Sequence, residues 1–326
     1  MNGAQISRHD AVYVAGHTGL AGSAIERALK RHGYTGVVTA PHSRLDLTRT
    51  RAVDQFFDDE RPDVVILAAA RVGGIVANSE RPADFIRDNL QIQTNVIDAA
   101  HRFGARKLVF LGSSCIYPRL APQPMREEYL LTGALEPTND AYAIAKLAGI
   151  KMCQAYRHQH GFDAVSVLPT NLYGPGDNYH PHHSHVIPGL IRRMLDAKLA
   201  EAPQFDVWGS GEPRREFLHC DDFAEAIVTV LERYSAEQPL NIGAGEDVTI
   251  AELAGLVRQA VGFEGKLVFD RSKPDGTPRK LLDSSRIREL GWAPKIALAQ
   301  GIADTCQVYR ETHAPELEAR RRSAGR

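Results

Sequence analysis

A tyrosine and a lysine stand one helical turn apart in the run Tyr142-Ala-Ile-Ala-Lys146. Residues four positions apart lie on the same face of a helix, so the phenol and the ammonium group are expected to be neighbours. A free tyrosine has a pKa of roughly 10, and a nearby positive charge favours the phenolate and makes the phenol a better proton donor. The pair therefore indicates an acid for carbonyl chemistry. The alternative is a packed Tyr142 beside a solvated Lys146.

A glycine-rich turn near the N-terminus indicates that a cofactor binds in the same protein as this acid. The apolar run 11–15 stops at Gly16-His-Thr-Gly19-Leu-Ala-Gly22, and residues 24–31 continue with helical spacing. In a strand-turn-helix context, this motif lets backbone N–H groups at a helix N-terminus approach a pyrophosphate. The turn therefore predicts a dinucleotide site, with a purely structural glycine turn as the alternative.

The residues after the second expected strand, 36–40, bear on the choice of dinucleotide. NAD sites usually place an acidic residue there, whereas this chain has Pro41-His42-Ser43-Arg44. With no carboxylate in this run, Arg44 and His42 are free to meet a ribose 2′-phosphate, which favours NADP. The alternative is that Arg44 faces water.

Strands and helices alternate through the first half of the chain, which is typical of a doubly wound, parallel α/β sheet of the Rossmann type. Ligands in such folds bind at the carboxyl ends of the strands, where Gly73-Gly74 and Gly112-Ser113-Ser114-Cys115 occur. Beyond the first two strands, the expected elements are a helix at 51–59, a strand at 64–67, a helix at 82–103, a strand at 107–111, a helix from Asn139-Asp140 to 160 and a strand at 164–168.

Ser113 and Cys115 are candidate reactive groups at the end of the strand 107–111. A serine hydroxyl there can hydrogen-bond a substrate carbonyl. In an extended chain, Cys115 would point to the same side as Ser113, two residues before it. The alternative for Cys115 is a buried cysteine that acts as a small hydrophobic residue.

A change of composition after Pro169-Thr-Asn-Leu-Tyr-Gly-Pro175 predicts a second, substrate-binding lobe. Residues 1–172 are expected to bind the dinucleotide, with 216–247 returning to that domain through a helix capped by the run Leu218-His-Cys-Asp221-Asp222 and a strand at 240–243. Residues 173–215 and 248–315 are expected to form the smaller, interleaved lobe, with a charged loop at 270–280 and a flexible tail at 316–326.

Two clusters of side chains in this lobe are candidate functional groups, one of histidines and one of arginines with a tryptophan. Histidines at 180, 182, 183 and 185 lack clear partner ligands, so we expect no metal and instead one general acid. Trp208, with Arg192-Arg193 and Arg214-Arg215, would suit a flat base and a diphosphate through stacking and bidentate hydrogen bonds. The alternative is a solvated basic rim.

Composition narrows the function classes for this 326-residue chain. A formal net charge of −1 gives no broad field for nucleic acid or an anionic membrane, and the apolar run 64–76 is too short to span a bilayer. The first ten residues lack the apolar stretch of a signal peptide. Four dispersed cysteines without a C-x-x-C pair favour a reducing compartment, so we expect a cytoplasmic protein.

Taken together, these motifs and several others resemble the GDP-L-fucose synthase family, the GDP-4-keto-6-deoxy-mannose epimerase/reductases among the extended short-chain dehydrogenases/reductases. The resemblance covers residues 12 to 292. Besides the glycine turn and the Tyr142–Lys146 pair, it rests on Ala69-Ala-Arg-Val-Gly-Gly-Ile-Val-Ala-Asn78, Gly112-Ser-Ser-Cys-Ile-Tyr-Pro118, Pro169-Thr-Asn-Leu-Tyr-Gly174, Ser184-His-Val-Ile-Pro188 and Lys273-Pro-Asp-Gly-Thr-Pro-Arg-Lys280.

The resemblance implies two reactions in one pocket. Cys115 would be the base and His185 the acid that invert C3 and C5 of the 4-keto sugar. Hydride from NADPH would then reach C4 while Tyr142 protonates the oxygen, with Lys146 and Ser113 assisting. The resemblance also implies a homodimer, and it places Arg193, Trp208 and Arg215 on the GDP part with Asp275 and Lys280 nearby.

The expected dinucleotide site departs from some relatives. Thr18, Ala40 and His42 stand where those relatives carry basic residues, which leaves NADH as the alternative to NADPH. The residues expected at the cofactor are Gly16, His17, Thr18, Gly19, Leu20, Ala21, Gly22, His42, Arg44, Asp46, Leu47, Leu111, Gly112, Ser113, Ser114, Tyr142, Lys146, Pro169, Thr170, Asn171, Leu172 and His185.

Other functions fit part of the pattern. A nucleotide-sugar 4-epimerase or 4,6-dehydratase would share the Tyr/Lys pair. A dehydratase would also need an acidic pair near Cys115, but the sequence there is Cys115-Ile116. A relative that makes GDP-colitose or a 6-deoxy-talose could use much the same residues. A regulatory protein that binds NADP without turnover would not need the Tyr142–Lys146 pair.

Overall fold

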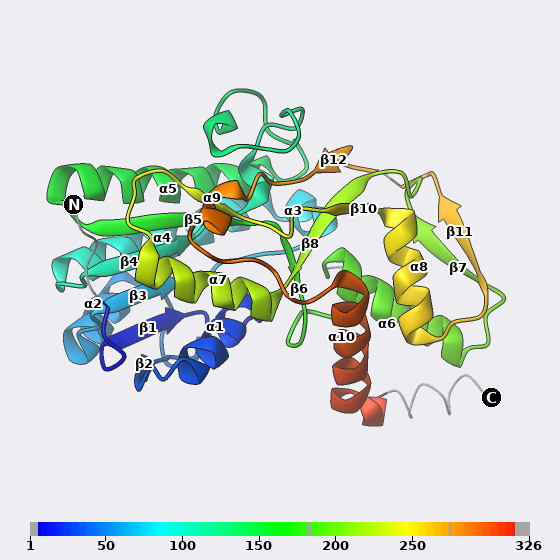
Figure 1. The fold of residues 1–326 in the computed structure, drawn as a ribbon, viewed down its shortest axis with the longest axis horizontal. Helices are drawn as coiled ribbons and strands as arrows, with labels where there is room; N and C mark the ends of the chain where they lie inside the picture. The colour runs from blue at the N-terminus through cyan, green and yellow to red at the C-terminus, as the bar shows by residue number, and fades with distance from the viewer. Residues whose placement is uncertain (1–5, 181–183, 274, 317–326) are drawn as a thin grey trace.

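The computed structural model describes residues 6–180, 184–273 and 275–316, and Figure 1 shows how they fold. Within them, six parallel strands form the main sheet in the order β2-β1-β3-β4-β5-β9. The chain runs outward from β1 to β2 and then returns past β1 to β3, and ligands bind outside the strand ends at such a reversal. These strands are β1 (Ala11–Ala15), β2 (Gly36–Val38), β3 (Val64–Leu67), β4 (Lys107–Leu111), β5 (Asp163–Pro169) and β9 (Leu240–Ile242).

Helices cover both faces of this sheet, as the sequence predicts. Along β1, Val12 and Val14 join the core beneath one pair of helices, whereas Tyr13 and Ala15 join the core on the other face. Strands buried on both faces are apolar at every position, because each side chain meets a helix layer. One layer holds α1 (Leu20–Arg31) and α7 (Cys220–Arg233), and the other holds α2 (Thr50–Glu60), α4 (Pro82–Arg102) and α5 (Asp140–His160).

A smaller lobe stands beside the sheet, on the right in Figure 1, around a core of its own. Val167 of β5 pairs with Leu240 of β9, so the chain runs back into the main sheet at β9. The full domain division stays a prediction, and residues 317–326 of the expected tail lie outside the described residues. The lobe contains α6 (Val186–Leu199), β7 (Gln204–Trp208), α8 (Ile250–Val261), β11 (Lys266–Asp270) and α10 (Leu298–Thr312).

A second sheet lies between the main sheet and the lobe. Its central strand, β8 (Arg214–His219), pairs with β6 (Asn171–Tyr173), β10 (Asp247–Thr249) and β12 (Arg279–Lys280). The prediction of a loop over the whole of 270–280 is therefore wrong at its end, where two residues pair with β8. The remaining short elements are α3 (Ile75–Glu80), α9 (Ser285–Glu289) and 3-10 turns at Ser114–Ile116 and Glu127–Tyr129.

The starts of two predicted helices lie where the sequence places them, at Asn139 and within the run 218–222, but their capping hydrogen bonds differ in detail. Asn139 precedes α5, but its side chain makes no capping hydrogen bond, and Asp140 instead accepts from the Ala141 N–H at 2.6 Å. Helix α7 begins at Cys220, and the His219 ring nitrogen accepts from the Asp221 N–H at 3.2 Å. In both places a neighbouring polar side chain competes for the same backbone donors.

No helix in the described part of the chain has the length and apolarity needed to cross a membrane.

Candidate active site

A cavity of about 1030 Å³ opens at the carboxyl ends of the main-sheet strands and extends to the small lobe. Every catalytic residue expected from the sequence lines it, and so do most of the expected binding residues. Those that do not line it are His17, Arg44, Asp275 and, from the arginine pairs, Arg192 and Arg214. The five catalytic candidates in the wall are Ser113, Cys115, Tyr142, Lys146 and His185.

The glycine turn forms a cradle that side chains would fill. Gly16 has a φ of +88°, and a Cβ on it would lie 2.7 Å from the Ala69 backbone. A Cβ on Gly22 would lie 2.1 Å from the Gly16 carbonyl oxygen, so only glycine lets α1 start this close to β1. The turn and the first residues of α1 line the cavity, as does the predicted pair Gly73-Gly74. A backbone without side chains at a helix N-terminus leaves its N–H groups accessible, which fits a dinucleotide pyrophosphate.

The structure does not place Arg44 where the sequence suggested. Its guanidinium lies 3.1 Å from the Glu60 carboxylate, and its side chain is 63% exposed. His42 and Asp46 line the cavity instead. Hydrogen bonds from the Thr48 hydroxyl and N–H, at 2.7 and 3.0 Å, hold the Asp46 carboxylate and lower its pKa. The sequence does not predict this contact, because Glu60 lies at the end of α2 and not beside Arg44 in the local sequence.

Tyr142 and Lys146 share one face of α5, but the lysine is directed elsewhere than expected. The Lys146 ammonium donates to the Leu111 carbonyl at 2.8 Å and lies 6.0 Å from the Tyr142 ring centroid. Burial lowers the pKa of Lys146 to about 7. Burial and the Cys115 charge raise the pKa of Tyr142, against a lowering hydrogen bond with Ser113. The lysine is thus not among the groups that shift the tyrosine pKa in this structure.

Cys115 lies in the 3-10 turn that follows β4, where an extended chain was expected. The turn brings Ser113 and Cys115 together, because the Ser113 hydroxyl accepts from the Cys115 N–H at 3.2 Å. The Lys280 ammonium lies 3.6 Å from the thiol sulfur, although the resemblance placed this lysine near GDP. Burial raises the pKa of Cys115, but Lys280, Ser113 and His185 together bring it below the ordinary thiol value.

His185 precedes α6 and has a neighbour of the opposite charge. Its Nδ1 lies 3.6 Å from a carboxylate oxygen of Asp177, whose side chain is almost fully buried. Burial lowers the pKa of His185, but Asp177 and the Cys115 charge outweigh it, and the net pKa is raised. The arrangement favours a thiolate at Cys115 and an imidazolium at His185, which is the charge state of a base and an acid.

The contact of Asp177 with His185 was missed, since the sequence between them shows no helical or strand periodicity that would predict it. The histidine cluster cannot be judged as a whole, because residues 182 and 183 lie outside the described residues. Within the described ranges, no group of three or more His, Cys, Asp or Glu side chains could hold a metal ion.

The far end of the cavity carries an aromatic and cationic wall. The Arg193 guanidinium lies 4.4 Å from the Trp208 ring centroid and donates to the Asp206 carbonyl at 2.6 Å. Arg215 also lines the cavity, and burial lowers its pKa. Asp275 instead accepts from the Ser210 N–H and hydroxyl at 2.7 and 2.8 Å. Asp275 therefore holds the turn after Trp208 and is not part of the cavity wall.

Comparisons with known proteins agree with this geometry. The model of the NAD dependent epimerase/dehydratase family matches residues 12–243. A probable GDP-L-fucose synthase 1 of Oryza sativa subsp. japonica is 61% identical over 92% of each chain. The GDP-L-fucose synthase of Escherichia coli (strain K12) is 54% identical over 92% of this chain and 96% of its own.

Among solved structures, a GDP-L-fucose synthetase from Naegleria fowleri bound to NADP is similar in fold. It has a TM-score of 0.87 and 30% sequence identity, and the match covers 95% of this chain and 97% of that one. The likeness spans both the main sheet and the smaller lobe.

Proposed function

Because the chain belongs to the NAD dependent epimerase/dehydratase family, we propose that it converts GDP-4-keto-6-deoxy-D-mannose to GDP-L-fucose. The conversion consists of epimerisation at C3 and C5, followed by NADPH-dependent reduction at C4. The observation that carries the proposal is the pairing of Cys115 and His185 in one cavity with Tyr142, each of the two with neighbours that favour its working charge. Relatives named for this activity, at 61% and 54% identity, support it.

Epimerisation needs a base and an acid near the same sugar. The C4 ketone acidifies the hydrogens on C3 and C5, so the Cys115 thiolate can remove one and leave an enolate. His185 returns a proton to the opposite face, which inverts the centre. Each inversion moves one proton from carbon to sulfur and one from the imidazolium to carbon, and both groups then regain their starting protonation states by proton exchange with solvent.

Reduction uses Ser113 and Tyr142, which lie beside Cys115 in the same cavity. The glycine turn and the residues after β4 and β5 would hold NADPH, which supplies the hydride for C4 when bound. Ser113 donates a hydrogen bond to the C4 oxygen, and Tyr142 gives its proton to the alkoxide as it forms. The buried Lys146, with a pKa lowered to about 7, can exchange protons near neutral pH and refill the phenol. Trp208, Arg193 and Arg215 would take the GDP part.

The test measures both reactions. Purified protein with GDP-4-keto-6-deoxy-D-mannose and NADPH in D₂O should oxidise the cofactor, seen at about 340 nm, and place deuterium at C3 and C5 of the product. A Cys115→Ser variant should lose most of the deuterium incorporation. Absence of cofactor oxidation would overturn the proposal, and product NMR would separate L-fucose from a colitose-type sugar.

We also propose that the protein is a cytoplasmic homodimer. Helices α4 and α5 pack side by side on the outside of the sheet, and Ile144 of α5 leaves 47% of its surface exposed. The four cysteines are all free thiols, which suits a reducing compartment. Light scattering should give twice the chain mass of 35.9 kDa, and Ile144→Glu should shift it toward the monomer.

A further inference from the structure

Lys280 lies beside a thiol and has no carboxylate partner among the described residues. Its ammonium is 3.6 Å from the Cys115 sulfur, within reach of an N–H···S hydrogen bond. Ammonium groups at this distance favour the thiolate over the thiol. The contact joins distant parts of the chain, since Cys115 follows β4 of the main sheet and Lys280 ends β12 of the second sheet.

The register of β12 on β8 decides which way Lys280 points. Arg279 pairs with Arg214, and Lys280 pairs with Arg215. Because neighbouring residues in a strand face opposite sides, Arg214 and Arg279 share one face, while Lys280 and Arg215 share the face toward the cavity. Four cations therefore sit on two paired strands, two on each side.

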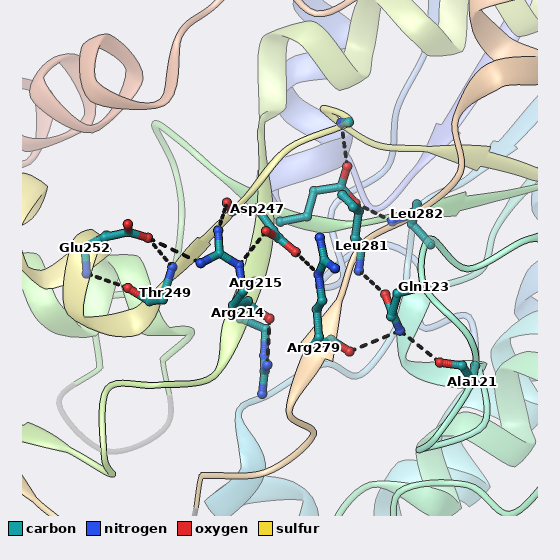
Figure 2. A network of polar contacts seen from close by, with 12 residues as sticks. Ala121, Gln123, Arg214, Arg215, Asp247, Thr249, Glu252, Arg279, Leu281 and Leu282 are labelled. Atoms are coloured by element: carbon teal, nitrogen blue, oxygen red, sulfur yellow. Dashed lines mark hydrogen bonds and ion pairs between the residues drawn. The ribbon is translucent and has the colours of Figure 1, made fainter.

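Asp247 of β10 holds the outer pair. One carboxylate oxygen accepts from the Arg214 Nε at 2.7 Å, and the other accepts from the Arg279 Nε, as Figure 2 shows. The carboxylate is almost completely buried between the two guanidinium groups. This clamp fixes the backbone of both strands, and with it the side from which Lys280 enters the cavity.

The residues after Lys280 are tied on both sides as well. The Leu281 N–H donates to Gln123 at 2.8 Å (Figure 2). The Leu282 N–H donates to the Glu216 carboxylate at 3.0 Å. Gln123 also donates to the Arg279 carbonyl at 3.3 Å. The lysine therefore projects from a stretch of chain that is held before and after it.

We propose, on the basis of the function above, that Lys280 is a positioning residue that keeps Cys115 as a thiolate for proton abstraction, and that the Asp247 clamp sets its place. The groups facing the thiol are Lys280 from β12, Arg215 from β8, His185 before α6, and Ser113 and Tyr142 from the main-sheet side. Arg215 is a weaker candidate for this role, because its guanidinium donates to the Arg214 and Asp275 carbonyls, at 2.9 and 3.4 Å.

The test titrates the thiol directly, without substrate or cofactor. Alkylation of Cys115 by iodoacetamide is followed by mass spectrometry across pH, since the thiolate is the reacting form. The buried Cys153, Cys220 and Cys306 serve as internal references. Lys280→Gln should move the midpoint of alkylation upward by about one pH unit or more. Lys280→Arg should restore most of the shift, and Lys266→Met on β11 should leave the midpoint unchanged.

The Asp247 clamp and the affinity for the GDP-sugar provide two further measurements. Asp247→Asn should shift the midpoint in the same direction but less, because Lys280 remains present but is less firmly held. An unchanged midpoint in Lys280→Gln, with a raised KM for the GDP-sugar, would overturn the proposal and assign the lysine to the substrate phosphates. If Lys280→Gln shifts the midpoint but the unmodified protein makes no GDP-fucose, the proposed function is wrong. The assignment of Lys280 to the Cys115 thiolate then still holds.

Discussion

Cys115 and His185 face the same cavity, each beside a group of the opposite charge. Lys280 favours the negative thiolate, and Asp177 favours the positive imidazolium. The two side chains could in principle exchange roles, since both titrate within a few units of neutrality. Their neighbours therefore decide which of them removes a proton and which supplies one.

Removing the Asp177 charge should narrow the pH range of epimerisation. His185 must be protonated to act as an acid, and Asp177 raises its pKa, so activity persists as pH rises toward that raised value. In Asp177→Asn the pKa falls, and the alkaline limb of deuterium incorporation at C3 and C5 should move to lower pH by roughly one unit. An unmoved alkaline limb would show that Asp177 has no part in the titration.

Tyr142→Phe should separate the two reactions. The phenol is assigned only to protonation of the C4 oxygen, so NADPH oxidation should fall by about 10²- to 10⁴-fold. Deuterium incorporation into the 4-keto sugar should continue, since Cys115 and His185 remain. Rapid-quench analysis of the sugar in D₂O measures both quantities in one sample. Loss of both reactions together would assign the tyrosine to epimerisation too.

At the scale of elements, the close approach of α1 to β1 depends on glycine. Gly22→Ala would place a methyl group 2.1 Å from the Gly16 carbonyl, so the turn must move away from its cradle geometry. Such overpacking costs about 1–3 kcal/mol, and we expect the Kd for NADPH to rise roughly tenfold by calorimetry. Gly255→Ala in α8 is the matched control, because a Cβ there meets nothing within 4 Å. An equal affinity in both variants would contradict this reading.

Local sequence was enough to predict the sheet, the glycine turn and the placing of Tyr142 and Lys146 on one helix face, whereas the roles of Cys115 and His185 come from the family resemblance and stay a prediction. The first three depend on patterns within a few residues, such as apolar runs, glycine spacing and residues one helical turn apart. The direction of single charged side chains was not predictable in the same way. Arg44 meets Glu60, and Lys280 meets Cys115, through contacts that only the tertiary fold creates. The two-residue strand β12 is likewise too short to leave a periodic signal.

At the scale of the whole molecule, one buried carboxylate ties several segments together. Glu216 of β8 is fully buried and accepts from the Gly245 N–H at 2.7 Å and the Leu282 N–H at 3.0 Å. It therefore links the strand between the lobes to the chain after β9 and after β12.

Glu216→Ala should destabilise the entire fold. The buried Leu282 N–H and the part-buried Gly245 N–H would lose their acceptor, which we expect to lower the free energy of unfolding by about 3 kcal/mol. Urea unfolding measured by circular dichroism provides the value, with the exposed Glu212→Ala as the control. A loss below about 1 kcal/mol would show that other acceptors or water replace the carboxylate.

Strand β12 lies near the C-terminal end of the described chain, so it is synthesised after most of the active site. All six strands of the main sheet and the glycine turn precede residue 243, whereas Lys280 is added almost forty residues later. A nascent chain can thus complete its dinucleotide cradle while Cys115 still lacks its ammonium neighbour. On the proposal above, the unfinished protein carries a largely protonated, weakly reactive thiol. The thiolate form of Cys115 is favoured only once nearly the whole chain has been made.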